Sequence, residues 1–109
     1  MLISVSRDDN IKIIDLDGQI DVKTSDEVME KVTSLFDDKP TIISMEKVSY
    51  VSSSGLRALL MIAKKAKAQK VKTVYAALVP EVKDVMKMTG FLKMLQCVDT
   101  VSDAEKILC

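Results

Sequence analysis

Strand-like and helix-like segments alternate along almost the whole chain, and this alternation restricts the fold more than any other feature of the sequence. Short runs rich in Val and Ile have the composition of strands, whereas the segments between them repeat apolar residues at helical spacing. The expected strands are residues 2–5, 11–16, 41–51, 71–78 and 94–98, and the expected helices are 24–36, 54–69, 80–89 and 102–108. The order is therefore ββαβαβαβα, and strands that alternate with helices form parallel sheets through right-handed crossovers.

Residues that cap or break regular structure lie at the ends of these segments. Thr24–Glu27 and Ser102–Glu105 each have the Ser/Thr-x-x-Glu form of a capping box at a helix start. Gly18–Asp21 interrupts the strand pattern before the first helix. Pro80 suits the first turn of the third helix, and Gly90 suits its C-terminal end.

The length and the order of segments predict one domain. At 109 residues the chain can bury one core but is too short for a second. We expect a single α/β domain over residues 1–109, with a mixed, mostly parallel β-sheet packed against about four helices. Its antiparallel part is the initial hairpin, which turns at Arg7–Asn10. Only 4% of residues are aromatic, so we expect an aliphatic core. The seven methionines, among them Met61, Met86, Met88 and Met94, are expected to be mostly core filler, and an exposed one could serve an adaptable interface.

The residue inventory excludes several classes of function. Basic and acidic residues are equally numerous, 16 of each, which does not suggest a nucleic-acid binder. The chain has no His, so a Ser–His catalytic pair and most metal-ligand patterns are excluded, and we expect no enzyme activity, metal or cofactor. Cys97 and Cys109 are expected to be free thiols in a reducing cytoplasm rather than a disulfide. No apolar run predicts a signal peptide or a membrane span.

Charge is unevenly distributed although it sums to zero. Residues 1–30 hold eight acids against three bases, whereas Arg57–Lys72 holds six bases and no acid. A solvated helix flank with lysines near its C-terminal end is the simpler interpretation of the basic segment. A basic edge that faces a partner is the alternative.

Three serines and a glycine lie where the central strand is expected to enter the longest helix, in the segment Val51–Leu56. This position exposes hydroxyl groups and the free N–H groups of a first helical turn, where a phosphate is favoured. Spacing alone favours helix capping as the role of these serines. A serine hydrolase is disfavoured, because a nucleophile elbow needs glycine where Ser52 stands and no His is present. A nucleotide-binding regulatory domain is a further alternative, although no glycine-rich phosphate loop is present.

Three ordered motifs resemble one known family. They are Gly18–Asp21 before the first helix, Ser53–Leu56 after the central strand, and Pro80–Val82 followed by Thr89–Phe91 around the third helix. With these motifs the chain resembles the STAS domain of bacterial anti-sigma factor antagonists over nearly its whole length. The resemblance implies that Ser54, directly before the glycine, is phosphorylated, while Ser52 and Ser53 are expected to be caps.

The resemblance also implies a partner-switching cycle in which this chain performs no chemistry. An anti-sigma factor that is also a serine protein kinase binds the unphosphorylated chain and phosphorylates it, and a metal-dependent serine phosphatase reverses the modification. Neither nucleic acid nor membrane is expected as a partner. The residues expected to bind the partner are Gly18, Asp21, Ser52, Ser53, Ser54, Gly55, Leu56 and Arg57.

Two positions differ from the family pattern. Ser44 and Ser52 stand where the family usually has aspartate, near the end of the central strand and just before the two serines of the motif. Some relatives with altered motifs act as interaction or scaffold modules without a phosphate cycle, and this is the alternative function that the resemblance leaves open.

Overall fold

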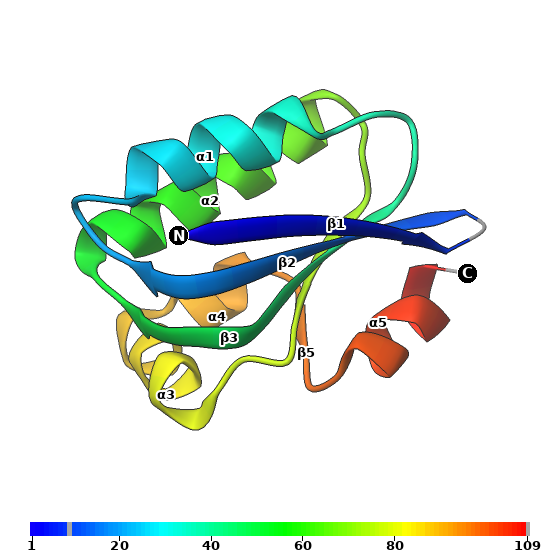
Figure 1. Cartoon of the computed structure of the whole chain (residues 1–109). Coiled ribbons are helices and arrows are strands. Elements are labelled where there is room, and N and C mark those ends of the chain that lie inside the picture. The colour runs from blue at the N-terminus through cyan, green and yellow to red at the C-terminus, as the bar shows by residue number, and fades with distance from the viewer. Residues whose placement is uncertain (9, 109) are drawn as a thin grey trace.

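The chain folds around one five-stranded sheet. The computed structural model describes residues 1–8 and 10–108, so Asp9 of the predicted turn, and Cys109, lie outside the described residues. The strands, shown in Figure 1, are β1 (Leu2–Asp8), β2 (Ile11–Ile20), β3 (Thr41–Val51), β4 (Thr73–Ala76) and β5 (Cys97–Val98). The helices are α1 (Ser25–Ser34), α2 (Ser53–Ala68), α3 (Pro80–Thr89), α4 (Phe91–Met94) and α5 (Val101–Leu108).

The sheet is mixed and mostly parallel, as the sequence predicts. β1 pairs with β2 antiparallel, and the pairs β2–β3, β3–β4 and β4–β5 are parallel. The strands lie in the order β1-β2-β3-β4-β5, so each crossover moves one strand along the sheet in the same direction. Right-handed crossovers of this kind place their helices on the same face of a sheet.

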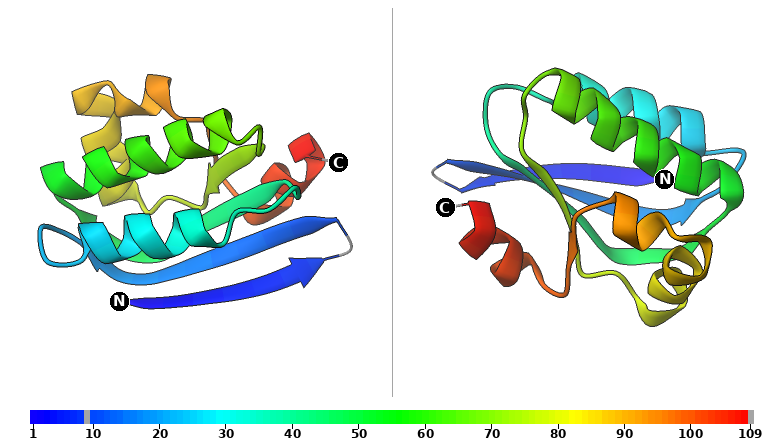
Figure 2. Two further views of the ribbon diagram at one scale, coloured as in Figure 1. Left: turned by 90° about the horizontal axis from the view of Figure 1, so that it is seen from above. Right: turned by 180° about the vertical axis from the view of Figure 1, so that it is seen from behind.

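Each face of the sheet carries its own group of buried side chains. On one face Ile14, Ile43 and Tyr75 of neighbouring strands pack with residues of α1, α2 and α3. On the other face Ile42 and neighbouring residues pack with α5. Figure 2 shows α5 across the sheet from α1 and α2. In the part of the chain that is described, none of the helices is both long enough and apolar enough to cross a membrane.

The last third of the chain differs most from its prediction. β4 is confined to Thr73–Ala76, and the final strand expected over residues 94–98 is confined to Cys97–Val98 as β5. The short helix α4 (Phe91–Met94), which precedes β5, was not expected. The described residues therefore contain five helices rather than about four. Apolar residues in a short segment satisfy either period equally well, and contacts with the rest of the chain decide between strand and helix.

The seven methionines were predicted to be mostly core filler: Met45 is buried in the core, and Met1 and Met29 pack against it. Met86 is fully buried, but Met61, Met88 and Met94 are 46%, 86% and 58% exposed. Helical spacing identifies a face that is apolar on average, and it does not distinguish the buried centre of that face from its rim.

Candidate functional site

The Gly18–Asp21 motif and the Ser53–Leu56 motif meet at the carboxyl ends of β2 and β3. Ile20 and Val51 are paired at the ends of these parallel strands. The N–H group of Ser52 then donates to the carbonyl oxygen of Ile20 at 2.9 Å. The backbone at Gly55 approaches the same carbonyl so closely that a Cβ atom there would lie 2.4 Å from it. These contacts join the Gly18–Asp21 motif and the serine motif into one site.

The sequence predicted that the strand would end before Gly18, but β2 continues to Ile20. The pairing of β2 with β3 shifts register between Gly18 and Gln19, and Gly18 has a φ of +133°, which L side chains rarely adopt. The glycine therefore allows β2 to bend without losing its pairing. This bend carries the chain to the loop that holds Asp21.

Asp21 organises the entry into α1. Its Oδ1 atom accepts hydrogen bonds from the backbone N–H groups of Lys23 at 2.9 Å and Thr24 at 3.2 Å. The predicted capping box at Thr24 is wrong: the Thr24 hydroxyl donates to the carbonyl of Gln19 at 2.7 Å and accepts from the Asp21 N–H at 3.0 Å. Asp21 and Thr24 thus hold the loop, because an Asx turn competes with capping for the same groups.

The serines have three different roles in the fold. Ser52 is the N-cap of α2, and its hydroxyl accepts a hydrogen bond from the Gly55 N–H at 3.2 Å. The expectation that Ser53 is also a cap is not met, because Ser53 is the first residue of α2 and its side chain is exposed. Ser54, the second residue of the helix, is partly exposed and lines a groove.

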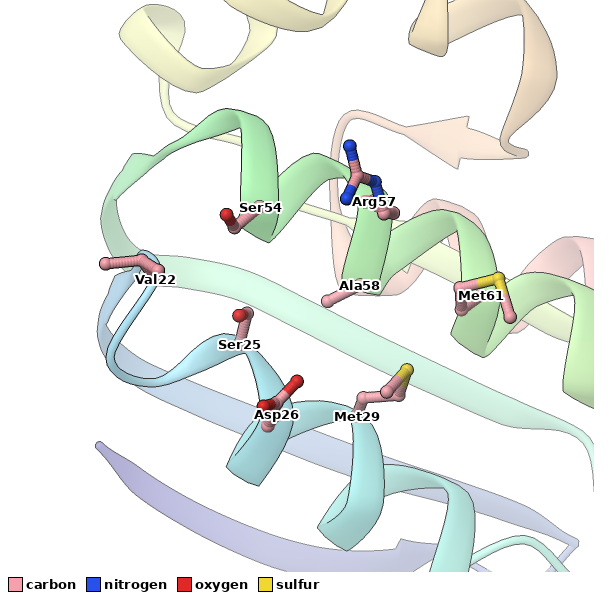
Figure 3. A pocket seen from close by; sticks show the side chains of 8 residues that line it. All are labelled: Val22, Ser25, Asp26, Met29, Ser54, Arg57, Ala58 and Met61. Carbon is pink, nitrogen blue, oxygen red and sulfur yellow. The ribbon is translucent and has the colours of Figure 1, made fainter.

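This groove separates α1 from α2 and has a volume of about 340 Å³. Figure 3 shows its two walls, with Ser54, Arg57 and Met61 on α2 and Asp26 and Met29 on α1. The remaining lining residues are Val22, Ser25 and Ala58. Sequence reasoning missed the α1 wall entirely, because no motif connects residues 22–29 with the serines. Val22, an apolar residue of this loop, is 75% exposed in the structure, and the sequence carries no comparable signal.

Two of the expected partner-binding residues lie beneath the surface. Leu56 is only 4% exposed and packs in the core shared with α1 and α3, and Gly55 is also buried. A side chain at Gly55 would collide with the backbone of Ile20. Both residues therefore support the site from below, while Ser53 and Arg57 are exposed beside it.

The two positions that differ from the family pattern have different environments. Ser52 lies in the site as the N-cap of α2. Ser44 is in register with Asp15 and Ala76 inside the sheet, where it is 1% exposed. Its hydroxyl has no hydrogen-bond partner among the described residues. An aspartate at position 44 would bury a carboxylate in register with Asp15, whereas an aspartate at position 52 would still cap the helix.

The titratable groups with shifted pKa values lie away from the groove. Burial raises the pKa of the Cys97 thiol from 9.0 to about 11, and Lys83 opposes this shift. Burial also raises the pKa of Tyr75 well above its ordinary value of 10.0. The Tyr75 hydroxyl donates to the carbonyl of Leu59 at 2.6 Å. Within residues 1–8 and 10–108 no His, Cys, Asp or Glu side chains gather in a group that could hold a metal ion.

Comparison with known proteins gives a consistent result. A sequence model described as the STAS domain matches residues 3–104. BtrV of Bordetella bronchiseptica, a candidate anti-sigma factor antagonist, is 24% identical over 96 residues, which cover 86% of this chain and 83% of BtrV. The crystal structure of an anti-sigma factor antagonist from Mycobacterium paratuberculosis has a TM-score of 0.86 at 21% identity, covering 98% of this chain and 92% of that one.

The anti-sigma factor antagonist SpoIIAA, in its unphosphorylated form, has a TM-score of 0.66 at 16% identity. That likeness covers 95% of this chain and 94% of SpoIIAA. At these identities the two structures agree with this chain in fold.

Proposed function

The chain belongs to the STAS domain family, and on that basis we propose that it is an anti-sigma factor antagonist controlled by phosphorylation of Ser54. The unphosphorylated chain binds an anti-sigma factor that is also a serine protein kinase. Phosphorylation by this partner releases the chain, and a metal-dependent serine phosphatase restores binding. The role is regulatory, and the chemistry belongs to the two partners.

The observation that carries this proposal is the position of Ser54. Its side chain is partly exposed at the rim of the groove, while Ser52 carries out the capping of α2. The Ser54 hydroxyl is therefore available to a kinase without loss of the cap. The partner surface consists of Asp21, Ser53, Ser54 and Arg57, with Gly18, Ser52, Gly55 and Leu56 shaping it from within.

A phosphoryl group at this position would change the surface without refolding it. It adds about −1.5 to −2 charges beside Asp26, which lines the opposite wall of the groove. A partner that covers a typical interface of roughly 1,200–2,000 Å² would have to desolvate this added charge.

Binding of the purified anti-sigma factor to Ser54 variants tests the proposal. We expect Ser54→Ala to bind with unchanged affinity and to resist phosphorylation, because only a hydroxyl group is lost from the surface. Ser54→Asp should bind at least about tenfold more weakly, which corresponds to about 1.4 kcal/mol. Titration calorimetry measures the affinity, and mass spectrometry after incubation with ATP measures phosphorylation.

Ser102→Asp is the matched control. Ser102 is the second residue of α5, as Ser54 is of α2, and it lies on a helix that packs on the opposite face of the sheet. Equal binding by Ser54→Asp and Ser102→Asp would refute the phosphorylation switch. Full binding without any phosphorylation of the original protein would instead favour a scaffold module, and binding of ATP to the isolated chain would favour a nucleotide-binding domain.

A further inference from the structure

Ser54 and Arg57 lie on the same side of α2, because residues three apart in a helix are neighbours on its surface. Both line the groove between α1 and α2, and Arg57 is the only basic side chain among the lining residues. The ion pairs between described side chains are Lys12–Asp37 and Lys83–Asp99, and Arg57 takes part in neither. Its exposed guanidinium is therefore available for a new anion on Ser54.

Apart from Arg57, no side chain that lines the groove carries a positive charge that could neutralise such an anion. Asp26, on the facing wall of the groove, carries a negative charge that repels it. The first turn of α2 offers only the partial charge of its N–H groups, and one of these, the Gly55 N–H, already donates to the Ser52 hydroxyl. Arg57 is the remaining source of positive charge, and its planar fork of donors matches phosphate oxygens.

We propose that Arg57 is the intramolecular receptor of the phosphoryl group on Ser54. The guanidinium turns along α2 onto the phosphate and is thereby withdrawn from the partner surface. This inference rests on the proposed function, since it names the residue that binds the phosphate formed on Ser54. It also assigns a chemistry to the partner: an acidic side chain that pairs with Arg57 in the unphosphorylated complex, beside an apolar group that enters the groove between Met29 and Met61.

Two effects of phosphorylation on binding follow from this arrangement. The acidic group of the partner loses its counterion, because Arg57 is occupied. Before modification, the opposite charges of Arg57 and Asp26 balance in the groove lining. After modification the lining carries a net negative charge, which repels the same acidic group. Release of the partner therefore depends on Arg57 as well as on the phosphate.

The second pKa of the phosphate tests the inference directly. Phosphoserine is installed at position 54 during translation, so no kinase is needed, and the phosphorus NMR shift is followed against pH. A nearby opposite charge favours the dianion, so we expect a pKa about one unit below the ordinary value of about 6. Arg57→Gln should return the pKa to about 6, and Arg57→Lys should give an intermediate value. Asp26→Asn should lower the pKa further, because it removes the like charge across the groove.

Lys64→Gln is the matched control, since it removes an exposed base from the same helix away from Ser54. It should leave the phosphate pKa unchanged. A pKa that does not respond to Arg57→Gln, or that responds equally to Lys64→Gln, would overturn the inference. Failure of the anti-sigma factor to phosphorylate Ser54 would refute the proposed function instead, and the NMR titration would still report on Arg57.

Discussion

At the scale of single residues, Gly55 sets the geometry of the site through its missing side chain. The carbonyl oxygen of Ile20 occupies the space that a Cβ atom would need, and this oxygen belongs to a backbone that cannot move alone. We expect Gly55→Ala to lower the free energy of unfolding by about 2 kcal/mol, within the range for overpacking. Urea denaturation measures the loss, and amide NMR shifts should change most at Ile20 and Asp21.

Ser53→Ala is the control for Gly55→Ala, because it changes the neighbouring exposed residue of α2. It should leave the free energy of unfolding within about 0.5 kcal/mol of the original. An equal loss of stability in both variants would show that the close approach of Gly55 to Ile20 is not what excludes a side chain at position 55.

Ser52 is the second residue whose role follows from its local contacts. Aspartate caps helices as well as serine does, and its charge is favourable at a helix N-terminus. Ser52→Asp should therefore raise the free energy of unfolding by about 0.5 kcal/mol. It should also speed phosphorylation of Ser54 and leave the affinity of the unphosphorylated complex unchanged, since better positioning affects rate more than binding. Urea denaturation, single-turnover kinetics and calorimetry measure these three quantities.

Thr100→Asp provides the comparison, because the Thr100 hydroxyl accepts from the Asp103 N–H at 2.9 Å at the start of α5. It should stabilise the fold in the same way without changing phosphorylation of Ser54. Lost affinity in Ser52→Asp would mean that charge at position 52 imitates the phosphate, contrary to our expectation.

At the scale of elements, α1 is held to the sheet by a buried lysine that no sequence motif marks. Lys12 of β2 is 2% exposed, and its Nζ atom donates to the carbonyl of Leu35 at the end of α1 and to Asp37 Oδ2, the latter at 2.7 Å. Asp37 Oδ1 also accepts from the Lys39 N–H at 2.9 Å. The lysine thus satisfies a helix-end carbonyl and links β2, α1 and the loop that follows.

Removing the charge of Asp37 should destabilise this junction. Asp37→Asn keeps an oxygen for the Lys39 amide but leaves the Lys12 cation without its counterion, so we expect a loss of about 2 kcal/mol. Asp38→Asn, at the exposed neighbouring position, should cost less than about 0.5 kcal/mol. Urea denaturation of both variants measures the difference. In a Lys12→Met background the effect of Asp37→Asn should be smaller, and a loss of the same size there would contradict the pairing.

At the scale of the whole molecule, burial of Tyr75 and Cys97 makes unfolding depend on alkaline pH. The two residues are neighbours in register between β4 and β5. Burial raises the pKa of Cys97 to about 11 from 9.0, and that of Tyr75 well above 10.0. The folded chain therefore keeps protons that the unfolded chain releases. Stability that is fully present below pH 9 should fall as pH rises through 9 to 11.

Urea denaturation at pH values from 8 to 10.5 measures this dependence. The free energy of unfolding of Tyr75→Phe should fall less steeply above pH 10 than that of the original protein. That of Cys97→Ala should fall less steeply above pH 9, because each variant lacks one of these protons. Tyr50→Phe is the control, since its ring is 51% exposed. Identical slopes in all four proteins would show that neither buried group contributes.

Much of the architecture follows from local sequence alone. The order of the first strands and helices, the parallel sheet and the end of α3 at Gly90 in a left-handed conformation agree with the predictions. The position of Ser54 beside the start of the long helix is also a local property. Hydrophobic period, turn residues and helix stops act over a few neighbouring residues, so a sequence pattern contains them.

Only the tertiary structure decided how the site is assembled. The approach of Gly55 to Ile20 and the wall that Asp26 and Met29 contribute to the groove join residues about 30 positions apart. The contacts of Lys12 beneath α1, and the lack of a partner for the Ser44 hydroxyl among the described residues, likewise depend on which strands become neighbours. Such contacts arise when parallel strands bring separate loops to one edge of the sheet. Their energy depends on distance in space, which the local pattern of residues does not encode.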